Sequence, residues 1–480
     1  MYSKFGQFIN GKWQPSEKKE TYNVINPATE EVIGKASKAT KKDVIKALKS
    51  AENGFKIWKK TPAWERSYKI RKISELIRER KNVLAKWLAL EVGKPLVEGI
   101  GEVVSAADIF EWNSEETKRI FGQTVESRFE ETRVQVIYQP IGVVAALVPW
   151  NFPIILASRK ISTALAAGCS VIVKPDVITP GSVMEMMNII NDADIPPGVV
   201  NLLSGDPEQI SNDLISSDII KKVSITGSTR VGKLILKKAA DKVQRVTMEL
   251  SGHAPFIVFE DSNIDKVTDM AIASKYRNNG QVCISPTRFY IHESKKEDFI
   301  KTFIEKTKKL KIGDGLKEGT HLGPITTKKR LEEIEKLVEK TKKEGGKILY
   351  GGKRPAGFNK GYFYEPTIID NVKDNFTIMT EEPFGPITPI TTFKKFDEVI
   401  ERANKHECGL AGYVCTNSMK KAFKASEQLE TGIVAVNTPV VATAETPFGG
   451  IKQTGYGREG GSVGIKDYLN IKYTHLGLSG

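Results

Sequence analysis

Three short polar strings in the sequence carry side chains that could act on a carbonyl carbon. They are PWNFP (149–153), MELSGHAP (248–255) and GQVCISPTR (280–288). The strings hold Asn151, Glu249 and Cys283, respectively. A thiol, an amide and a carboxylate together suit acyl chemistry, because they offer a nucleophile, a donor for an oxyanion and a base for water.

Taken singly, each of these residues has an ordinary structural interpretation. An isolated cysteine is most often a small buried hydrophobic residue, and Cys169 and Cys415 fit that description. An asparagine beside prolines is commonly a turn residue, and a glutamate at a strand end is commonly solvated. Residue type alone does not decide between these interpretations and a catalytic site; the pattern in which the three strings occur together favours the catalytic site. His253 is interpreted as structural, since Glu249 already offers a base.

A glycine-containing string, GSTRVGK (227–233), lies where a predicted strand meets a predicted helix. Backbone N–H groups at a helix N-terminus favour phosphate, which makes Gly227 and Ser228 candidate cofactor contacts. The two glycines, Gly227 and Gly232, fit turn positions equally well. Leu234 stands where a P-loop needs Ser or Thr to ligate magnesium, and the middle glycine of the GxGxxG pattern is missing. The string alone therefore does not indicate an ATPase.

Composition and charge narrow the class of protein. The chain has 480 residues, 40% hydrophobic and 27% charged, which is typical of a folded protein of two or three domains. The net charge is +14, but the lysines are scattered over helical stretches such as 41–60 and 328–347. They are not interleaved with aromatic residues, so a solvated surface is favoured and no nucleic-acid partner is expected.

Cysteine usage and hydropathy exclude two further classes. The 4 cysteines form no CxxC pair and no zinc-like spacing with the 5 histidines, so no metal site is predicted. The apolar segment 142–158 is interrupted by Pro149, Asn151 and Pro153, and the N-terminal residues do not resemble a signal peptide. No membrane partner is expected, and a cytoplasmic location is predicted.

Strand-like and helix-like runs alternate around the three strings. Residues 41–115 are mostly amphipathic helix. Strand-like runs follow at 143–149, 170–175, 199–205, 221–227 and 244–250, separated by helical segments at 158–167, 181–192, 207–216 and 230–240. This alternation predicts βαβ units and a parallel sheet, which binds ligands at the carboxyl ends of its strands. A second α/β stretch begins near residue 255.

Together with KPD (174–176) and EEPFGP (381–386), the three strings resemble the aldehyde dehydrogenase superfamily. The resemblance extends from FINGKW (8–13) to PFGGIKQTGYGREGG (447–461), with the motifs in the family order and at family-like spacing. It implies an NAD(P)-dependent enzyme that oxidises an aldehyde to a carboxylate.

The same resemblance implies a role for each catalytic residue. Cys283 would add to the aldehyde carbon as a thiolate, and hydride transfer from the resulting thiohemiacetal would leave a thioester. The side-chain amide of Asn151 and the backbone N–H of Cys283 would hold the oxyanion. Glu249 would activate the water that releases the carboxylate.

The predicted fold class is α/β, with a Rossmann-like parallel-sheet cofactor domain, a second α/β catalytic domain and a small β oligomerisation arm. The predicted boundaries are 1–118 and 141–249 for the cofactor domain, 250–440 for the catalytic domain, and 119–140 and 463–480 for the arm. TRVQVIYQ (132–139) alternates with period two, and IKDYLNIKYTHL (465–476) is a second extended segment. Edge strands of this kind often pair with another subunit, so a homodimer or homotetramer is expected.

Eight residues of this sequence match positions that contact the cofactor in the aldehyde dehydrogenase superfamily. They are Trp150, Lys174, Gly205, Gly227, Ser228, Leu250, Glu382 and Phe384. Lys174 would contact the adenosine ribose and Glu382 the nicotinamide ribose. Val177 stands where NAD-preferring members often carry a glutamate that binds the ribose 2′-hydroxyl. The absence of an anion at this position favours NADP over NAD. The carboxylate of Asp176 would favour NAD instead if it points toward the ribose. Ser251 replaces the usual family glycine.

The substrate prediction depends on two arginines. Arg159 and Arg277 match the arginines that bind the substrate carboxylate in succinate-semialdehyde dehydrogenases, and Thr443 falls near an assisting hydroxyl. Guanidinium groups bind carboxylates through paired hydrogen bonds. The resemblance therefore implies a carboxylated semialdehyde, such as succinate semialdehyde or 2-oxoglutarate semialdehyde. In the alternative interpretation each arginine forms a structural ion pair.

Three other functions stay open at the level of sequence. A general aliphatic or lactaldehyde-type dehydrogenase is one, since some lactaldehyde-type members share the first arginine. A CoA-acylating enzyme is another, but it needs no base such as Glu249. A non-catalytic binding protein would not be expected to retain Asn151, Glu249 and Cys283 together.

Overall fold

The first sheet of the computed structural model, which describes residues 2–478, has the strand order β11-β10-β7-β8-β9-β1-β2. Its strands are β1 (Gln7–Ile9), β2 (Lys12–Gln14), β7 (Val143–Leu147), β8 (Ser170–Lys174), β9 (Val200–Leu202), β10 (Ile220–Thr226) and β11 (Arg245–Glu249). Strands β7 to β11 are parallel, whereas β1 pairs antiparallel with β9 and β2. The chain moves outward from β7 through β8 to β9, then returns to the other side of β7 for β10. This reversal places a ligand-binding crevice at the carboxyl ends of β7 and β10.

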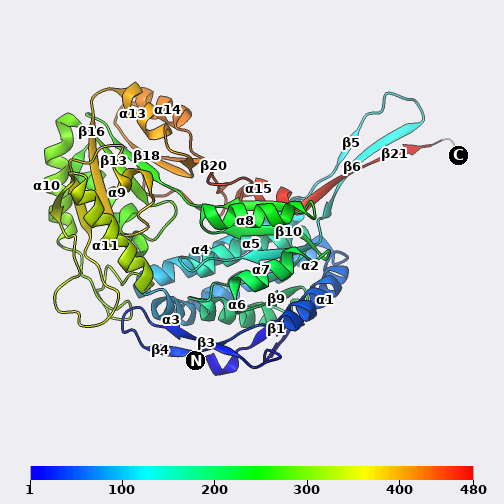
Figure 1. Ribbon diagram of the computed structural model, residues 1–480. Helices are drawn as coiled ribbons and strands as arrows, with labels where there is room; N and C mark the ends of the chain where they lie inside the picture. Colours follow the sequence, from blue (N-terminus) through cyan, green and yellow to red (C-terminus); the bar gives the residue numbers. More distant parts are fainter. Residues whose placement is uncertain (1, 479–480) are drawn as a thin grey trace.

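Helices cover both faces of this sheet (Figure 1). They are α1 (Lys41–Trp58), α2 (Ala63–Glu79), α3 (Lys81–Glu91), α4 (Leu96–Glu116), α5 (Pro153–Ala167), α6 (Pro180–Asp192), α7 (Pro207–Ile215) and α8 (Thr229–Ala240). Along β7, Val144 and Ala146 join one buried apolar cluster, whereas Val143 and Ala145 join another. A strand that is buried on both faces consists of consecutive apolar residues, and for this reason the sequence of β7 predicted a strand.

The second sheet has the order β14-β15-β16-β13-β12-β18-β19 and is parallel except for β14. Its strands are β12 (Ala254–Val258), β13 (Pro286–His292), β14 (Lys347–Tyr350), β15 (Thr367–Asp370), β16 (Ile387–Phe393), β18 (Ala411–Cys415) and β19 (Ile433–Val436). Its helices are α9 (Ile264–Lys275), α10 (Lys296–Thr307), α11 (Lys328–Lys343), α12 (Thr377–Thr380), α13 (Phe396–Asn404) and α14 (Met419–Gln428).

Three strands form an arm that extends away from the two sheets (Figure 1). They are β5 (Gln123–Val125), β6 (Thr132–Pro140) and β21 (Leu469–Gly477), and β21 pairs antiparallel with β6 along its whole length. Smaller elements are the hairpin of β3 (Thr21–Ile25) and β4 (Val32–Ser37), the pair β17 (Cys408–Gly409) and β20 (Ile451–Lys452), and α15 (Gly461–Gly464).

The predicted fold class is confirmed, with a Rossmann-like parallel sheet, a second α/β sheet and a β arm. The domain boundaries stay a prediction, and their outermost residues, 1 and 479–480, lie outside the described residues. Helices α6 and α8 begin one residue before their predicted starts, whereas α5 begins five residues earlier, at Pro153 instead of residue 158. The sequence suggested a turn at PWNFP, but proline is well suited to the first position of a helix, because its missing N–H has no partner there anyway. Within residues 2–478, no helix combines the length and apolarity of a membrane span.

Candidate active site

Two cavities meet at Cys283. One, called here the arginine cavity, has a volume of about 400 Å³ and is lined by Arg159 and Arg277 among others. The other, called the helix cavity, has a volume of about 580 Å³ and is lined at one side by Gly227 and Ser228 at the start of α8. Cys283 and Asn151 line both cavities, and Glu249 lines the helix cavity. The structure thus brings the three predicted catalytic residues together.

Cys283 lies in the loop between the short 3-10 helix Arg277–Gly280 and β13. The 3-10 helix before the loop is kinked, with Asn278 and Asn279 at φ of 46° and 54°. Gly280 has a φ of 72°, and a Cβ there would lie 2.2 Å from the carbonyl oxygen of Gly385, so only glycine fits. Burial, and then the carboxylates of Glu382 and Glu249, raise the pKa of the Cys283 thiol to about 12. The thiol is therefore neutral near pH 7 and needs a base to become a nucleophile.

Glu249 is the last residue of β11, and its side chain is 2% exposed. Neither carboxylate oxygen has a hydrogen-bond partner among residues 2–478. Burial, followed by repulsion from Glu459, raises the pKa of Glu249 well above its usual value, against the attraction of Lys160. A Cβ on Gly449 would lie 2.7 Å from Oε1, so a glycine is needed beside the carboxylate. A buried carboxylate with free acceptors at a cavity wall can bind and deprotonate a water molecule.

Asn151 lies in the segment between β7 and α5, just beyond the carboxyl end of β7. Its Nδ2 donates to the carbonyl oxygen of Gln281 at 3.2 Å. Its own backbone carbonyl accepts from Lys94 Nζ at 3.0 Å and from Asn278 Nδ2 at 3.1 Å. An amide carries two N–H groups, so one remains available to an oxygen atom in the cavity.

The helix cavity fits a dinucleotide. Helix α8 begins at Thr229, and the hydroxyl of its N-cap, Ser228, accepts from the backbone N–H of Val231 at 3.4 Å. The other N–H groups of the first turn and the positive end of the helix dipole suit phosphate groups. A Cβ placed on Gly227 would meet no atom within 4 Å, so the cavity is open at this point.

The opposite wall of the helix cavity includes Glu382 and Phe384. The ring of Phe384 meets that of Trp150 edge to face, with centroids 5.6 Å apart. Burial raises the pKa of Glu382 to about 8. The guanidinium of Arg330 donates to the backbone carbonyls of Glu382, Pro383 and Phe384, and so holds the strained turn at Phe384, whose φ is 41°.

Three predicted cofactor residues do not line this cavity: Lys174, Val177 and Gly205. Lys174 ends β8 and is 5% exposed, and burial lowers its pKa. Gly205 packs tightly, because a Cβ there would lie 2.8 Å from the backbone nitrogen of Ala39. Ile178, next to Val177, lines the cavity instead. The roles of the three residues stay predictions.

Arg159, on α5, is 4% exposed and lies within the arginine cavity. Its Nη1 has no hydrogen-bond partner in the described part of the chain, and its Nη2 donates only weakly to the carbonyl oxygen of Thr443, at 3.5 Å. The hydroxyl of Thr443 contacts Thr446 at 3.3 Å. Arg277 stacks over the ring of Phe152, with its guanidinium carbon 4.8 Å from the centroid. Within residues 2–478, neither arginine forms an ion pair with an acidic side chain at 4.0 Å or less.

Sequence reasoning missed a group of lining residues in the first turns of α11. They are Lys329, Arg330 and Glu333. The lysine-rich segment 328–347 was interpreted as solvated surface, and most of this amphipathic helix fits that interpretation. Its N-terminal end lies over the helix cavity instead. No local signal marked this, because the cavity wall belongs to residues distant in the sequence.

The model of the aldehyde dehydrogenase family matches residues 13–474. The chain is 41% identical to the glutarate-semialdehyde dehydrogenase of Pseudomonas putida, over 97% of this chain and 96% of that protein. It is 39% identical to an NADP(+) succinate-semialdehyde dehydrogenase of Escherichia coli, over 98% of this chain and 97% of that protein. The crystal structure of succinate-semialdehyde dehydrogenase from Burkholderia pseudomallei superposes with a TM-score of 0.97 at 38% identity, covering 98% of each chain.

These matches span the same residues as the two cavities and the loops that meet at Cys283. The chain belongs to the aldehyde dehydrogenase family and is an NAD(P)-dependent oxidoreductase that converts an aldehyde into a carboxylate.

Proposed function

We propose that this enzyme oxidises a semialdehyde whose far end carries a carboxylate, with succinate semialdehyde and glutarate semialdehyde as the leading candidates. The observation that carries the proposal is the pair of guanidinium groups, Arg159 and Arg277, in the cavity that ends at Cys283. Arg159 is buried and, among the described residues, has no acidic side chain at ion-pair distance. Such a buried cation is costly, and a substrate carboxylate would compensate it. The volume of about 400 Å³ suits a small substrate.

The names of the relatives support the same substrate class. The Pseudomonas putida protein is a glutarate-semialdehyde dehydrogenase, and the Escherichia coli protein is a succinate-semialdehyde dehydrogenase. Both substrates place a carboxylate a few methylene groups from the aldehyde. In this chain, Phe448 and Phe152 stack against the two guanidinium groups and help to hold them in place.

We infer the following roles for the chain's own residues. The sulfur of Cys283 loses its proton to water and bonds to the aldehyde carbon. The carbonyl π bond opens, and the Asn151 amide and the Cys283 backbone N–H bind the resulting oxyanion. A bound nicotinamide cofactor supplies the acceptor for the hydride and its two electrons, and Gly227, Ser228 and Glu382 would hold it. Glu249 then takes a proton from water, whose oxygen attacks the thioester carbon. The carbon–sulfur bond breaks, and the sulfur receives the proton that Glu249 took from water.

Removal of one guanidinium group should discriminate between substrates. We expect Arg277→Ala to lower kcat/KM for succinate semialdehyde by about 10- to 100-fold, because a charge-assisted hydrogen bond is lost. Butanal has a similar length but no carboxylate, so its kcat/KM should change little. Steady-state rates for both aldehydes, followed by reduced-cofactor absorbance, test this. A loss of equal size for the two aldehydes would reduce Arg277 to a structural role.

We propose NADP as the preferred cofactor. Val177 provides no anion against a 2′-phosphate, and the carboxylate of Asp176 is engaged by the backbone N–H of Ile178 at 3.0 Å. The Escherichia coli relative is named as an NADP(+) enzyme. We expect Val177→Glu to lower the ratio of kcat/KM for NADP to that for NAD by about 10- to 100-fold, through repulsion of the phosphate. Val177→Gln is the uncharged control of the same shape, and an equal shift in both variants would contradict the proposal.

We propose that the arm joins copies of this chain into a homodimer or homotetramer. On β21, Ile471 and Tyr473 are each 70% exposed. The edge strand of the arm therefore exposes apolar side chains, and its outer edge is unpaired among the described residues. Such edges are usually covered by another subunit.

A further inference from the structure

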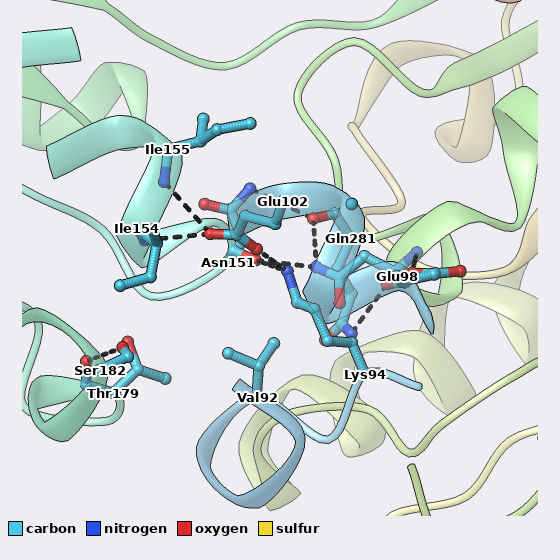
Figure 2. Close-up of polar contacts among 12 residues, drawn as sticks. Val92, Lys94, Glu98, Glu102, Asn151, Ile154, Ile155, Thr179, Ser182 and Gln281 are labelled. Atoms are coloured by element: carbon cyan, nitrogen blue, oxygen red, sulfur yellow. Dashed lines mark hydrogen bonds and ion pairs between the residues drawn. The ribbon is translucent and has the colours of Figure 1, made fainter. Parts of the chain in front are cut away.

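A buried ion pair lies next to the segment that carries Asn151 (Figure 2). Lys94 belongs to the connection between α3 and α4, and Glu102 lies in the second turn of α4. The Lys94 Nζ donates to Glu102 Oε2 at 2.5 Å, and both side chains are 0% exposed. A buried pair of this kind adds little stability over an apolar pair of similar volume, so its presence calls for another explanation.

Glu102 supplies the missing cap of α5. The N-cap residue of α5, Phe152, offers no side-chain hydrogen bond to the helix. The second carboxylate oxygen of Glu102 accepts instead from the backbone N–H groups of Ile154, at 3.0 Å, and Ile155, at 3.3 Å (Figure 2). These N–H groups have no partner within the helix, and a carboxylate also suits the positive end of the helix dipole. The start of α5 is therefore fixed by α4.

Lys94 holds the residues just before that cap. Besides the ion pair, its Nζ donates to the backbone carbonyl of Asn151 at 3.0 Å and lies 3.8 Å from the ring centroid of Phe152. Asn278 Nδ2 donates to the same carbonyl at 3.1 Å. The peptide plane that follows Asn151 is thus fixed by two donors on one side and by the capped helix on the other. Because the direction of the Cα–Cβ bond follows from the backbone, these contacts also orient the side-chain amide.

We infer that Lys94 and Glu102 are positioning residues that orient the Asn151 amide toward the oxyanion. The inference rests on the proposed role of Asn151 as an oxyanion donor. Such a donor must be held to within a fraction of an ångström of its productive geometry, because its contribution depends on preorganisation. Neither Lys94 nor Glu102 lines the helix cavity or the arginine cavity, so neither can contact a ligand bound there, and each acts on the reaction through other residues.

The chain offers a matched control in Glu91. This buried carboxylate, from the end of α3, accepts from the backbone N–H groups of Gly181 and Ser182, at 2.6 and 3.0 Å, and so caps α6 as Glu102 caps α5. Helix α6 carries none of the proposed catalytic residues. Glu91→Gln should therefore lower the thermal stability, as substitution of Lys94 or Glu102 does, but leave the rate of the chemical step unchanged.

The test is a double-mutant cycle of Lys94→Met and Asn151→Ala. Two rates are measured: the first turnover with succinate semialdehyde and NADP, and the hydrolysis of p-nitrophenyl acetate, which forms an oxyanion without the cofactor. We expect Asn151→Ala to slow both by about 10²- to 10³-fold. Lys94→Met should slow both by about 10- to 100-fold, with KM for NADP unchanged. In the Asn151→Ala background, Lys94→Met should add no further loss, because its effect passes through the amide.

Independent losses that multiply in the double variant would overturn the inference, as would an unchanged rate in Lys94→Met. A loss of rate in Glu91→Gln equal to that in Lys94→Met would also overturn it, since general destabilisation would then explain both. Glu102→Gln serves if Lys94→Met does not fold, because it keeps an oxygen for the α5 cap and loses only the charge that holds Lys94. An unchanged rate in Asn151→Ala would instead refute the proposed role of Asn151, and the inference with it.

Discussion

Replacement of Cys283 by serine is expected to lower kcat by about 10⁴- to 10⁶-fold, as loss of a covalent nucleophile does in other enzymes. The same burial that raises the pKa of the thiol to about 12 would act on an alcohol whose intrinsic pKa is much higher. No thiohemiacetal or thioester could then form at a useful rate. Steady-state oxidation of succinate semialdehyde and the mass of any acyl-enzyme both report this loss.

Cys415→Ser provides the control for this substitution. Cys415 is a free, buried cysteine at the end of β18 and lines neither the helix cavity nor the arginine cavity. Its replacement should leave the rate of a folded enzyme nearly intact. Oxidation at the wild-type rate by Cys283→Ser would eliminate the covalent mechanism.

Glu249→Gln is expected to lower kcat by about 10²- to 10⁴-fold, because general base catalysis of thioester hydrolysis is lost. The first turnover should persist, so reduced cofactor appears in a burst equal to the enzyme concentration and the acyl-enzyme accumulates. Stopped-flow absorbance measures the burst, and mass spectrometry identifies the acyl group on Cys283. A small added thiol should restore turnover, since it takes the acyl group without a base for water.

The pH dependence of hydrolysis gives a second signature of Glu249. A carboxylate is a base only when ionised, and the pKa of Glu249 is raised well above its usual value by burial and by Glu459. The hydrolysis rate should therefore be lost as pH falls through this raised pKa, at a higher pH than an exposed glutamate would show. Glu249→Gln should lack this acid limb. If the variant lost the first turnover as fully as hydrolysis, the role of Glu249 would lie in deprotonating Cys283 instead.

The sequence by itself determined the elements and the chemistry of this protein. Continuous apolar runs such as 143–147 are buried on both faces, and their alternation with helices predicted the parallel sheet. Glu249 ends one of these runs and Asn151 lies shortly after another, so their place at the carboxyl ends of strands was also predictable. Local patterns decide such features, because backbone geometry repeats within a few residues.

Tertiary structure alone decided which distant residues share a wall or a hydrogen bond. The start of α11 lies over the helix cavity, although its lysine-rich pattern indicates solvent. Glu102 caps α5 from another helix, and no residue near 152 predicts this. Arg159 and Arg277, 118 positions apart in the chain, line one cavity without an acidic neighbour at ion-pair distance in the described chain. Such pairings depend on how helices and sheets pack, and packing joins side chains without regard to their separation in the sequence.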